Sequence, residues 1–399
     1  MAKHTGVSRP VDDTSAPAIP PFEFGTAGRV LFGAGRLVEL PARVANWGTS
    51  ALVVTGASPH RHAGLIGGLP MRSELFAVTA EPTVETARAA VEVARAVGAD
   101  LVVAIGGGSV LDLGKTVAML LGNGGDPLDY LEVIGQGRPI TAPSVPMAAV
   151  PTTAGTGAEV TENAVLASPE HGRKASLRSA TMVPRLALVD PTLTVGCPPG
   201  VTASSGLDAL TQCLEPLVSS QANPVTDALA SAGLARAATG LRAAYADGSD
   251  VRARTDMALA SLLGGMALAN AKLGAVHGFA GVIGGLVPAP HGAICAALLP
   301  AVVEVNVRAL RARQPDSPAL ASYRNAAALL TGRPTAAIED GIDWIRETVS
   351  LLAIPRLAEL GVPNAAADDI VAKTRTASST KGNPIVLTDD ELAQVLAMS

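Results

Sequence analysis

Short apolar runs that end in small residues alternate with amphipathic patterns in the first half of the chain. The segments ALVVTGAS (residues 51–58), SELFAVTAEPT (73–83) and PMAAVPTTAGTGAE (146–159) each predict a strand followed by a turn. The segment 83–100 has apolar residues at helical spacing, and LVVAIGGGSVLDLGKTVAML (101–120) predicts a strand, a glycine turn and a helix. This alternation predicts a parallel sheet with helices on both faces.

The pattern changes near Asp190, after which strand signals nearly stop. Ala- and Leu-rich helical patterns cover residues 224–247 and 251–286, so the second half is predicted to be helical. A chain of 399 residues is also too long for one ordinary core, and we expect two domains that pack along a cleft. The expected divisions are a flexible tail (residues 1–20), an α/β domain (21–195) and a helical domain (196–399).

Composition and charge exclude several classes of protein. The chain is 48% hydrophobic, 16% charged and 3% aromatic, which is typical of a soluble enzyme and argues against a disordered chain. A net charge of -5 without a long basic run argues against a nucleic-acid partner. We see neither a secretory signal nor a membrane span. Cys197, Cys213 and Cys295 show no disulfide framework or paired-ligand spacing, so we expect a reducing, cytoplasmic location.

The first chemical signal is a glycine turn between a strand and a helix. The strand LVVAI runs into Gly106, Gly107, Gly108 and Ser109. Glycines let backbone N–H groups approach a phosphate closely, and the N-terminus of a helix carries partial positive charge. The turn therefore suits a pyrophosphate. Because the sequence is neither GxGxxG nor a P-loop, a tight turn without a ligand is an equal alternative.

A second turn of small residues follows another strand. In residues 150–165, Thr152, Thr153 and Thr156 stand beside two glycines and offer hydroxyl and backbone N–H groups to a ligand. A solvent loop or a helix cap would have the same composition. Open parallel sheets bind ligands beyond the carboxyl ends of their strands, so two such turns together favour one binding site.

The helical half contains a set of residues that suits a metal. Asp208 and Gln212 lie four residues apart on one predicted helix face, and His277 and His291 stand in apolar, Gly-rich surroundings. Two histidines and a carboxylate suit Fe(II) or Zn(II). A spacing of 14 residues between the histidines is not a local metal signature, so histidines that hydrogen-bond in the core remain an alternative.

Taken together, these motifs resemble the iron-containing (group III) alcohol dehydrogenases, including the maleylacetate reductase branch. The resemblance extends from about Phe22 to the C-terminus and rests on FEFGTAGRVLFGAG, GGGSVLDLGK, PTTAGTGAEVT, LALVDPTLT, GLDALTQ, GAVHGFA, PHGAICAALLP and KGNPIVLT. It implies a Rossmann-like dinucleotide-binding domain followed by an all-helical domain, the architecture also found in dehydroquinate synthase. It further implies hydride transfer between a nicotinamide cofactor, NAD(P)H, and a small alcohol, aldehyde or ketone. We expect the protein to act as a homodimer.

The resemblance also implies roles for individual residues. Those implied to bind the cofactor are Gly106, Gly107, Gly108, Ser109, Asp112, Thr152, Thr153, Thr156 and Lys174, with Lys115 and Gly157 in the same motifs. Asp208, His277 and His291 are implied as metal ligands and catalytic residues.

Two positions depart from the family pattern. Gln212 stands where the family has a metal-binding histidine, and Gly281 stands where it has a histidine that relays a proton. We expect Asp208, His277 and His291 to bind Fe(II) or Zn(II), with Gln212 as a weak fourth ligand or a water anchor. A site that works without metal, as in maleylacetate reductases, is the close alternative. Each departure also has an explanation without a role in catalysis. Gln212 would be an ordinary polar residue that hydrogen-bonds in a cleft, and Gly281 would allow two helices to pack closely.

The end of the first strand indicates cofactor preference. NAD enzymes often place an acid there to bind the ribose 2′-hydroxyl, but this chain has Gly56, Ser58 and, further on, Arg61. A 2′-phosphate would meet no repulsion, so we favour NADP(H).

Two other functions stay open: a cofactor-binding protein whose active site has eroded, and a lyase like dehydroquinate synthase. The lyase would need more basic phosphate-binding residues than the sequence offers.

Overall fold

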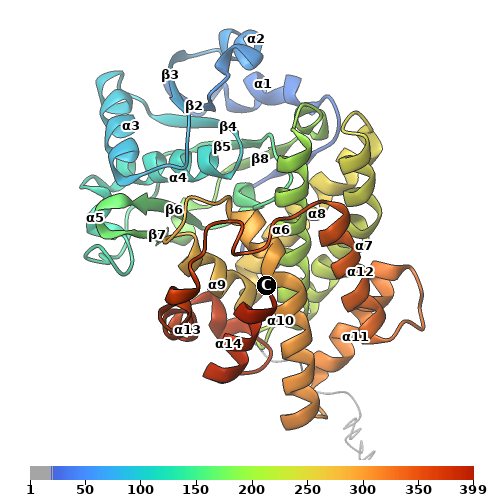
Figure 1. Cartoon of the computed structure of the whole chain (residues 1–399). Coiled ribbons are helices and arrows are strands. Elements are labelled where there is room, and N and C mark those ends of the chain that lie inside the picture. Colours follow the sequence, from blue (N-terminus) through green and yellow to red (C-terminus); the bar gives the residue numbers. More distant parts are fainter. Residues whose placement is uncertain (1–18, 20) are drawn as a thin grey trace, which may run out of the picture.

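A parallel sheet occupies the first half of the chain. The computed structural model describes residue 19 and residues 21–399, so the expected tail lies almost entirely outside the described residues. The sheet has six strands in the order β1-β8-β5-β4-β2-β3 (Figure 1). Their bounds are β1 (Val30–Phe32), β2 (Ser50–Gly56), β3 (Arg72–Val78), β4 (Leu101–Gly106), β5 (Met147–Pro151) and β8 (Leu186–Val189). All pairings are parallel, which confirms the predicted fold class.

Helices cover both faces of this sheet. They are α1 (Leu40–Val44), α2 (Ala63–Gly67), α3 (Val84–Ala96) and α4 (Gly108–Asn123). Alternate residues of the central strands point to opposite faces: Leu52 and Val102 pack with α3 and α4, whereas Val53 packs with α1 and α2. The central strands are therefore continuous apolar runs, as expected for a parallel sheet that is covered on both sides.

A two-stranded antiparallel sheet extends the α/β part beyond the predicted parallel one. β6 (Asn163–Ser168) and β7 (Arg173–Arg178) form a hairpin whose buried side chains, among them Leu166 and Leu177, join the core under α4. A short helix, α5 (Pro127–Tyr130), precedes β5. The sequence interpretation missed this hairpin, because it considered Lys174 only as a cofactor residue and not the alternation of buried residues around it.

The second half of the chain is helical, as expected, and no strand occurs among the described residues after Val189. The helices are α6 (Pro199–Val218), α7 (Pro224–Ala246), α8 (Val251–Ala271), α9 (Ala275–Ile283), α10 (His291–Arg313), α11 (Pro318–Thr331), α12 (Ile338–Leu351), α13 (Ala367–Thr376) and α14 (Asp389–Met398). One large core joins them, and α10 packs against α6 (Figure 1).

The pattern over residues 251–286, which resembles one helix in the sequence, is two helices. α8 and α9 meet at 97°, and Lys272 between them has a left-handed backbone with φ of 61°. Gly274 caps α9, and a Cβ there would lie 2.8 Å from a carboxylate oxygen of Glu215. The break places His277 in the first turn of α9, close to α6.

Among the described residues, α10 is long and apolar enough by composition to cross a membrane, and the bent α8–α9 pair passes the same test when it is taken together. Most of the apolar stretch of α10 is buried inside the protein, which is typical of a core helix. Ile294, Leu298 and Leu299 contribute to the helical core. That the protein does not act at a membrane remains a prediction.

Candidate active site

The turns that follow β2, β4 and β5 lie along one edge of the sheet. In the strand register Thr55 pairs with Ile105 and Gly106 pairs with Pro151. The N–H of Thr152 donates a hydrogen bond to the carbonyl of Gly106 over 2.9 Å. β2 and β4 are neighbours although β3 separates them in the chain, and α/β sheets bind ligands where the strand order reverses in this way.

The glycine turn and the threonine turn are in contact. A Cβ on Gly107 would lie 3.3 Å from Oγ1 of Thr153, and one on Gly108 would lie 2.8 Å from Cγ2 of Thr156. Helix α4 has Gly107 at its N-cap and no capping side chain. Its first N–H groups are therefore not bonded by a cap, which suits an anionic ligand at a helix N-terminus.

Asp112 and Lys115 fasten α4 to the hairpin beneath these turns. Lys115 is fully buried and donates to Oγ1 of Thr161 over 2.9 Å and to the carbonyl of Asn163. Asp112 accepts a hydrogen bond from the N–H of Val165 and lies 3.7 Å from the Lys115 ammonium group. Burial lowers the pKa of Lys115 and raises that of Asp112. Both residues bind the protein itself, and cofactor binding by Asp112 stays a prediction.

Glu159 lies buried just after the threonine turn, in the 3-10 turn Ala158–Val160. Burial raises its pKa from 4.5 to about 7. A carboxyl group with a raised pKa keeps its proton in the folded state after the unfolded chain has lost it, so the folded protein loses stability as pH rises from 4.5 to about 7. The shift corresponds to about 3 kcal/mol.

We therefore expect Glu159→Gln to flatten the pH dependence of stability. The free energy of unfolding, measured by urea denaturation at several pH values, should fall more steeply with pH in the parent protein than in the variant. Glu170→Gln changes an exposed carboxyl group and is the matched control. If the two variants had the same pH profile as the parent protein, Glu159 would already be ionised in the folded state across this range.

The remaining residues that were expected to bind the cofactor are Lys174, on β7, and Gly56 and Ser58, at the end of β2 and just after it. The Lys174 ammonium group pairs with Glu81 at 2.5 Å, and it lies 3.4 Å from the position of a Cβ on Gly284. Gly56 ends β2, and a Cβ there would meet no atom of the described residues within 4 Å. Ser58 stands at the N-cap position of the 3-10 turn Pro59–His62, and its side chain makes no capping hydrogen bond. The structure thus brings Gly56 to the same sheet edge as the glycine turn.

Three helices bring the expected metal ligands together with a residue that the sequence interpretation missed. Asp208 lies on α6, His277 in the first turn of α9 and His291 at the start of α10, with Cys295 one turn after His291. One ligand atom from each of these four residues lies within 4.8 Å of the other three. In the sequence Cys295 is one of three scattered cysteines, and its spacing of four residues from His291 is the available signal.

The donor atoms face one another without pairing fully. Oδ1 of Asp208 and Nε2 of His277 are 3.3 Å apart but not aligned for a hydrogen bond, and neither has another partner among the described residues. Nε2 of His291 lies 3.6 Å from Sγ of Cys295. Buried polar atoms without partners cost free energy. A carboxylate, two imidazoles and a thiol that share such a space fit a divalent metal ion.

Gln212 is buried beside this cluster, one turn along α6 from Asp208. Its amide nitrogen donates to Oδ2 of Asp208 over 2.9 Å. Its amide oxygen has no hydrogen-bond partner among the described residues. Metal ligation by Gln212 remains a prediction, whereas its hydrogen bond to Asp208 is a feature of the structure.

Glu215, which the sequence interpretation also missed, orients His277. It lies on the same face of α6 as Asp208, seven residues further on, and accepts hydrogen bonds of 2.7 Å from Nδ1 of His277 and from the N–H of Val276. The proton on Nδ1 leaves the lone pair on Nε2, which points to the cluster. Carboxylate partners of this kind commonly fix the tautomer of histidines that bind metals.

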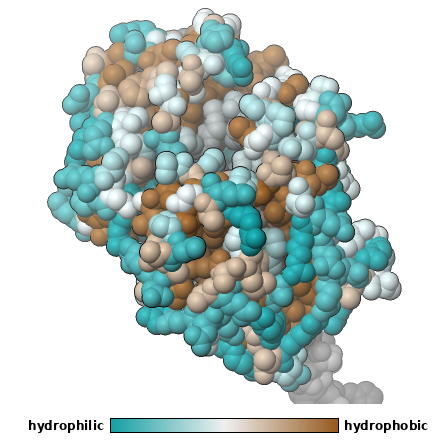
Figure 2. Space-filling model, viewed as in Figure 1, coloured by the Kyte–Doolittle hydropathy of each residue, from teal (hydrophilic) through white to brown (hydrophobic). Residues whose placement is uncertain are grey.

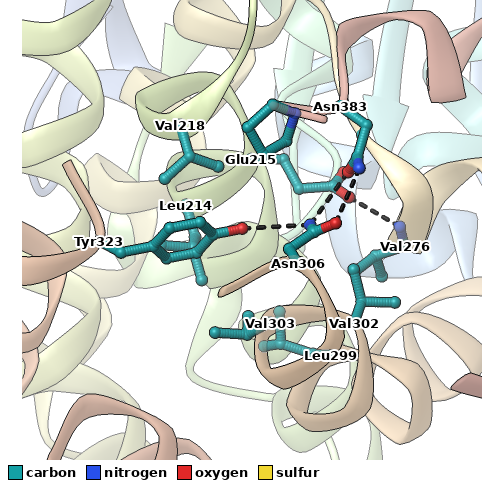
Figure 3. Close-up of a pocket in the computed structure, with 12 residues that line it drawn as sticks. Leu214, Glu215, Val218, Val276, Leu299, Val302, Val303, Asn306, Tyr323 and Asn383 are labelled. Atoms are coloured by element: carbon teal, nitrogen blue, oxygen red, sulfur yellow. Dashed lines mark hydrogen bonds between the residues drawn. The ribbon is translucent and has the colours of Figure 1, made fainter. Parts of the chain in front are cut away.

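A polar network behind Glu215 holds the start of α9 (Figure 3). Asn383, from the KGNPIVLT segment, exchanges hydrogen bonds with Asn306. It also accepts a hydrogen bond from the N–H of Ala275. Asn306 in turn donates to the hydroxyl of Tyr323 over 3.1 Å. This network explains structurally why a segment near the C-terminus belongs to the same motif set as His277.

The side chains of the cluster shift one another's pKa values toward the ionised forms. Burial would raise the pKa of Asp208, but the neighbouring His277 and His291 hold it below its usual value. Burial would lower the pKa of His277, yet Cys295, Asp208 and Glu215 raise it well above its usual value. Cys295 likewise raises the pKa of His291. These directions reflect the negative groups that surround two buried imidazoles, and a metal ion that binds the imidazoles has to displace their protons.

Comparisons with known proteins agree with this geometry. The family model described as iron-containing alcohol dehydrogenase matches residues 27–191, and the model of the C-terminal part of that family matches residues 202–399. Alcohol dehydrogenase 4 of Saccharomyces cerevisiae is 35% identical over 316 residues, which are 79% of this chain and 80% of that protein. 1,3-Propanediol dehydrogenase of Klebsiella pneumoniae is 40% identical over 268 residues, 67% of each protein.

Solved structures show the same architecture. The structure of a 1,3-propanediol oxidoreductase is 31% identical, with a TM-score of 0.87, and covers 95% of this chain and 99% of that one. A sulfoacetaldehyde reductase from Bifidobacterium kashiwanohense, solved in complex with NAD+, is 26% identical with a TM-score of 0.84, over 95% of this chain and 98% of that one. This chain therefore belongs to the iron-containing alcohol dehydrogenases, a family of NAD(P)-dependent oxidoreductases that act on alcohols and aldehydes.

Proposed function

We propose that this protein is an NADP(H)-preferring oxidoreductase that interconverts a small alcohol and its aldehyde or ketone at a metal site formed by α6, α9 and α10. One observation carries the proposal: the threonine turn packs directly against the helix that holds the ligands. A Cβ on Gly155 would lie 2.8 Å from the Cβ of Ser205, which stands one turn before Asp208. The cofactor turns and the cluster of donor atoms are therefore neighbours.

The surface supports a shared site between the two halves of the chain. The space-filling view is hollowed where the α/β part meets the helices (Figure 2). Of the four clustered residues, His291 is the one that is partly exposed, so the cluster opens on its side. We propose that the cofactor lies along the sheet edge and that the substrate enters beside His291. We place the domain boundary between residues 195 and 196, in the segment that links β8 to α6.

In the proposed mechanism the chain positions the two reactants. The glycine and threonine turns bind the phosphates and hold the nicotinamide beside the cluster, and Glu215 accepts the hydrogen bond of His277 Nδ1 and so orients Nε2 toward the cluster. Asp208, His277 and His291 would hold a divalent metal, which supplies Lewis-acid polarisation of a carbonyl oxygen. Gly281 is exposed and carries no side chain to relay a proton, so the alcohol proton exchanges with water or with a ribose hydroxyl of the cofactor.

The decisive experiment measures oxidation of NADPH and NADH by the purified protein with small aldehydes, ketones and 2-oxo acids, alongside its metal content. We expect turnover that depends on substrate and declines on dialysis against a chelator. Binding of cofactor without turnover of any substrate would instead support a cofactor-binding protein with an eroded site. Full turnover by metal-free protein would support a reductase that works like the maleylacetate branch.

We also propose that the enzyme is a cytoplasmic homodimer, which sedimentation and cell fractionation would test.

Cofactor preference is tested at the end of β2. Gly56→Asp places a carboxylate in open space where an NAD enzyme would have one, so the variant should fold normally. Two like charges about 4 Å apart repel by about 4 kcal/mol near a protein surface, and salt screening reduces this. We therefore expect the ratio of kcat/KM for NADPH to kcat/KM for NADH to fall by about 100-fold.

The matched control is Gly56→Asn, which has nearly the same size without the charge. It should retain most of the parent preference. A parent enzyme that already prefers NADH strongly would contradict the proposed preference for NADP(H), whatever the variants do.

A further inference from the structure

Cys295 occupies a position in the cluster that the metal-binding pattern of the family does not explain. It is fully buried on α10, one turn after His291, and its Sγ lies within 4.8 Å of the ligand atoms of Asp208, His277 and His291. The other buried cysteine, Cys213, lies on α6 and contacts the carbonyl of Ala260 instead. Burial alone therefore does not account for the place of the Cys295 thiol among three metal-binding groups.

Gln212 stands where the family pattern has an imidazole, but its amide nitrogen is committed to Asp208. That hydrogen bond, 2.9 Å to Oδ2, holds the carboxylate so that Oδ1 faces Nε2 of His277. The amide thus braces a ligand. A fourth donor is still available in the same space, and it is the sulfur of Cys295.

We propose that Cys295 binds the metal as a thiolate in place of the missing imidazole, which makes the site Asp208–His277–His291–Cys295, and that Gln212 positions Asp208. This inference rests on the proposed function, since it assigns a ligand of the same metal site. On binding, the thiol gives its proton to solvent and a metal–sulfur bond forms, with no change of oxidation state.

The distances fit a single ion. Ligands bonded at about 2.0–2.3 Å to a tetrahedral ion lie about 3.3 Å apart for an oxygen and a nitrogen, and about 3.6 Å apart for a nitrogen and a sulfur. The separation of Asp208 Oδ1 from His277 Nε2 is 3.3 Å, and that of His291 Nε2 from Cys295 Sγ is 3.6 Å. Both match edges of a tetrahedron around one ion, and the other separations between ligand atoms are within 4.8 Å.

A thiolate ligand changes which metal the site prefers. Sulfur is a soft donor, and sets of nitrogen and sulfur ligands favour Zn(II) over Fe(II). The proposal therefore makes this member of the iron-containing family a zinc-binding protein. Four protein ligands do not close the site to substrate, because zinc expands to five ligands during catalysis and the cluster is open at the partly exposed His291.

The test replaces the metal of the purified full-length protein with Co(II) and, separately, with Zn(II). Cobalt bound to a thiolate shows a near-ultraviolet sulfur-to-metal charge-transfer band that oxygen and nitrogen ligands do not give. We expect this band in the parent protein and in the control Cys213→Ala, and we expect it to be absent from Cys295→Ser and Cys295→Ala. Zn(II) affinity, measured by competition with a chromophoric chelator, should fall by more than about 100-fold in both Cys295 variants, since loss of an outer partner alone costs 10–100-fold.

The variant Gln212→Ala tests whether Gln212 positions Asp208 or binds the metal itself. It should keep the charge-transfer band and lose Zn(II) affinity by about 10–100-fold, the range expected for an outer partner. The inference is overturned by a parent protein that binds Co(II) without the band, or by one that binds neither ion. The spectrum of the parent protein is therefore a sufficient test of the Cys295 ligand even if the variants do not fold. A band in the parent without any turnover would instead contradict the proposed function and leave the ligand assignment standing.

Discussion

Replacing His277 by alanine is expected to remove the bound metal and to lower kcat/KM by about 1000-fold. Its Nε2 faces Oδ1 of Asp208 at 3.3 Å, and Glu215 fixes the other ring nitrogen at 2.7 Å, so alanine removes a donor that is already oriented toward the cluster. Loss of one preorganised group that stabilises charge in a transition state typically costs about 100- to 1000-fold. Metal content after chelator dialysis and steady-state kinetics are the two measurements.

Stability must be followed in the same variant. The alanine leaves the carboxylates of Asp208 and Glu215 buried without their histidine partner, and an unpaired buried group costs about 1–3 kcal/mol. Thermal denaturation shows whether the protein is folded at the assay temperature. His171→Ala is the matched control, because His171 is exposed in the β6–β7 turn and hydrogen-bonds Ser168. A folded His277→Ala variant with the parent metal content would remove His277 from the ligand set.

The sequence predicted the parts of the fold that depend on local patterns. The central strands are apolar on both faces, so their composition alone indicates a covered parallel sheet. The glycine and threonine turns follow directly from those strands, and parallel strands bring their carboxyl ends to one edge, where Gly106 and Thr152 meet. These relations need no knowledge of how distant helices pack.

The missed features depend on packing between distant segments. Cys295 and Glu215 lie at helical spacing from His291 and Asp208, but many pairs of residues have such spacing and only the crossing of α6, α9 and α10 selects these. The break between α8 and α9 arises at Lys272 and Gly274, and Gly274 is one of several glycines in a segment whose residues are at helical spacing. A single glycine is tolerated inside many helices, so its effect emerges only from the contact with Glu215.

Substitution of Gly107 by valine is expected to weaken NADPH binding by more than about 100-fold. Gly107 is the N-cap of α4, and even a Cβ at this position would lie 3.3 Å from Oγ1 of Thr153, so the two further methyl groups of valine add bulk beside the first N–H groups of the helix. Hydrogen bonds from backbone N–H groups to a charged phosphate contribute about 1.5–3 kcal/mol each. Loss of two of these hydrogen bonds costs about 3 kcal/mol or more. Because about 1.4 kcal/mol changes a dissociation constant tenfold, the dissociation constant of NADPH should rise by more than about 100-fold.

Gly200→Val is the matched control for this substitution. Gly200 is exposed in the first turn of α6, where a Cβ would meet no described atom within 4 Å apart from the adjoining residues of its own helix, so the same change of residue there should leave cofactor binding intact. Fluorescence titration of NADPH measures the dissociation constants, and thermal denaturation checks that both variants are folded. Gly107→Ala should lie between the parent and Gly107→Val, because Thr153 can yield to one methyl group. If folded Gly107→Val bound NADPH as tightly as the parent, the phosphates would not lie on the α4 N-terminus, and the role assigned to Gly56 at the neighbouring strand would lose its basis as well.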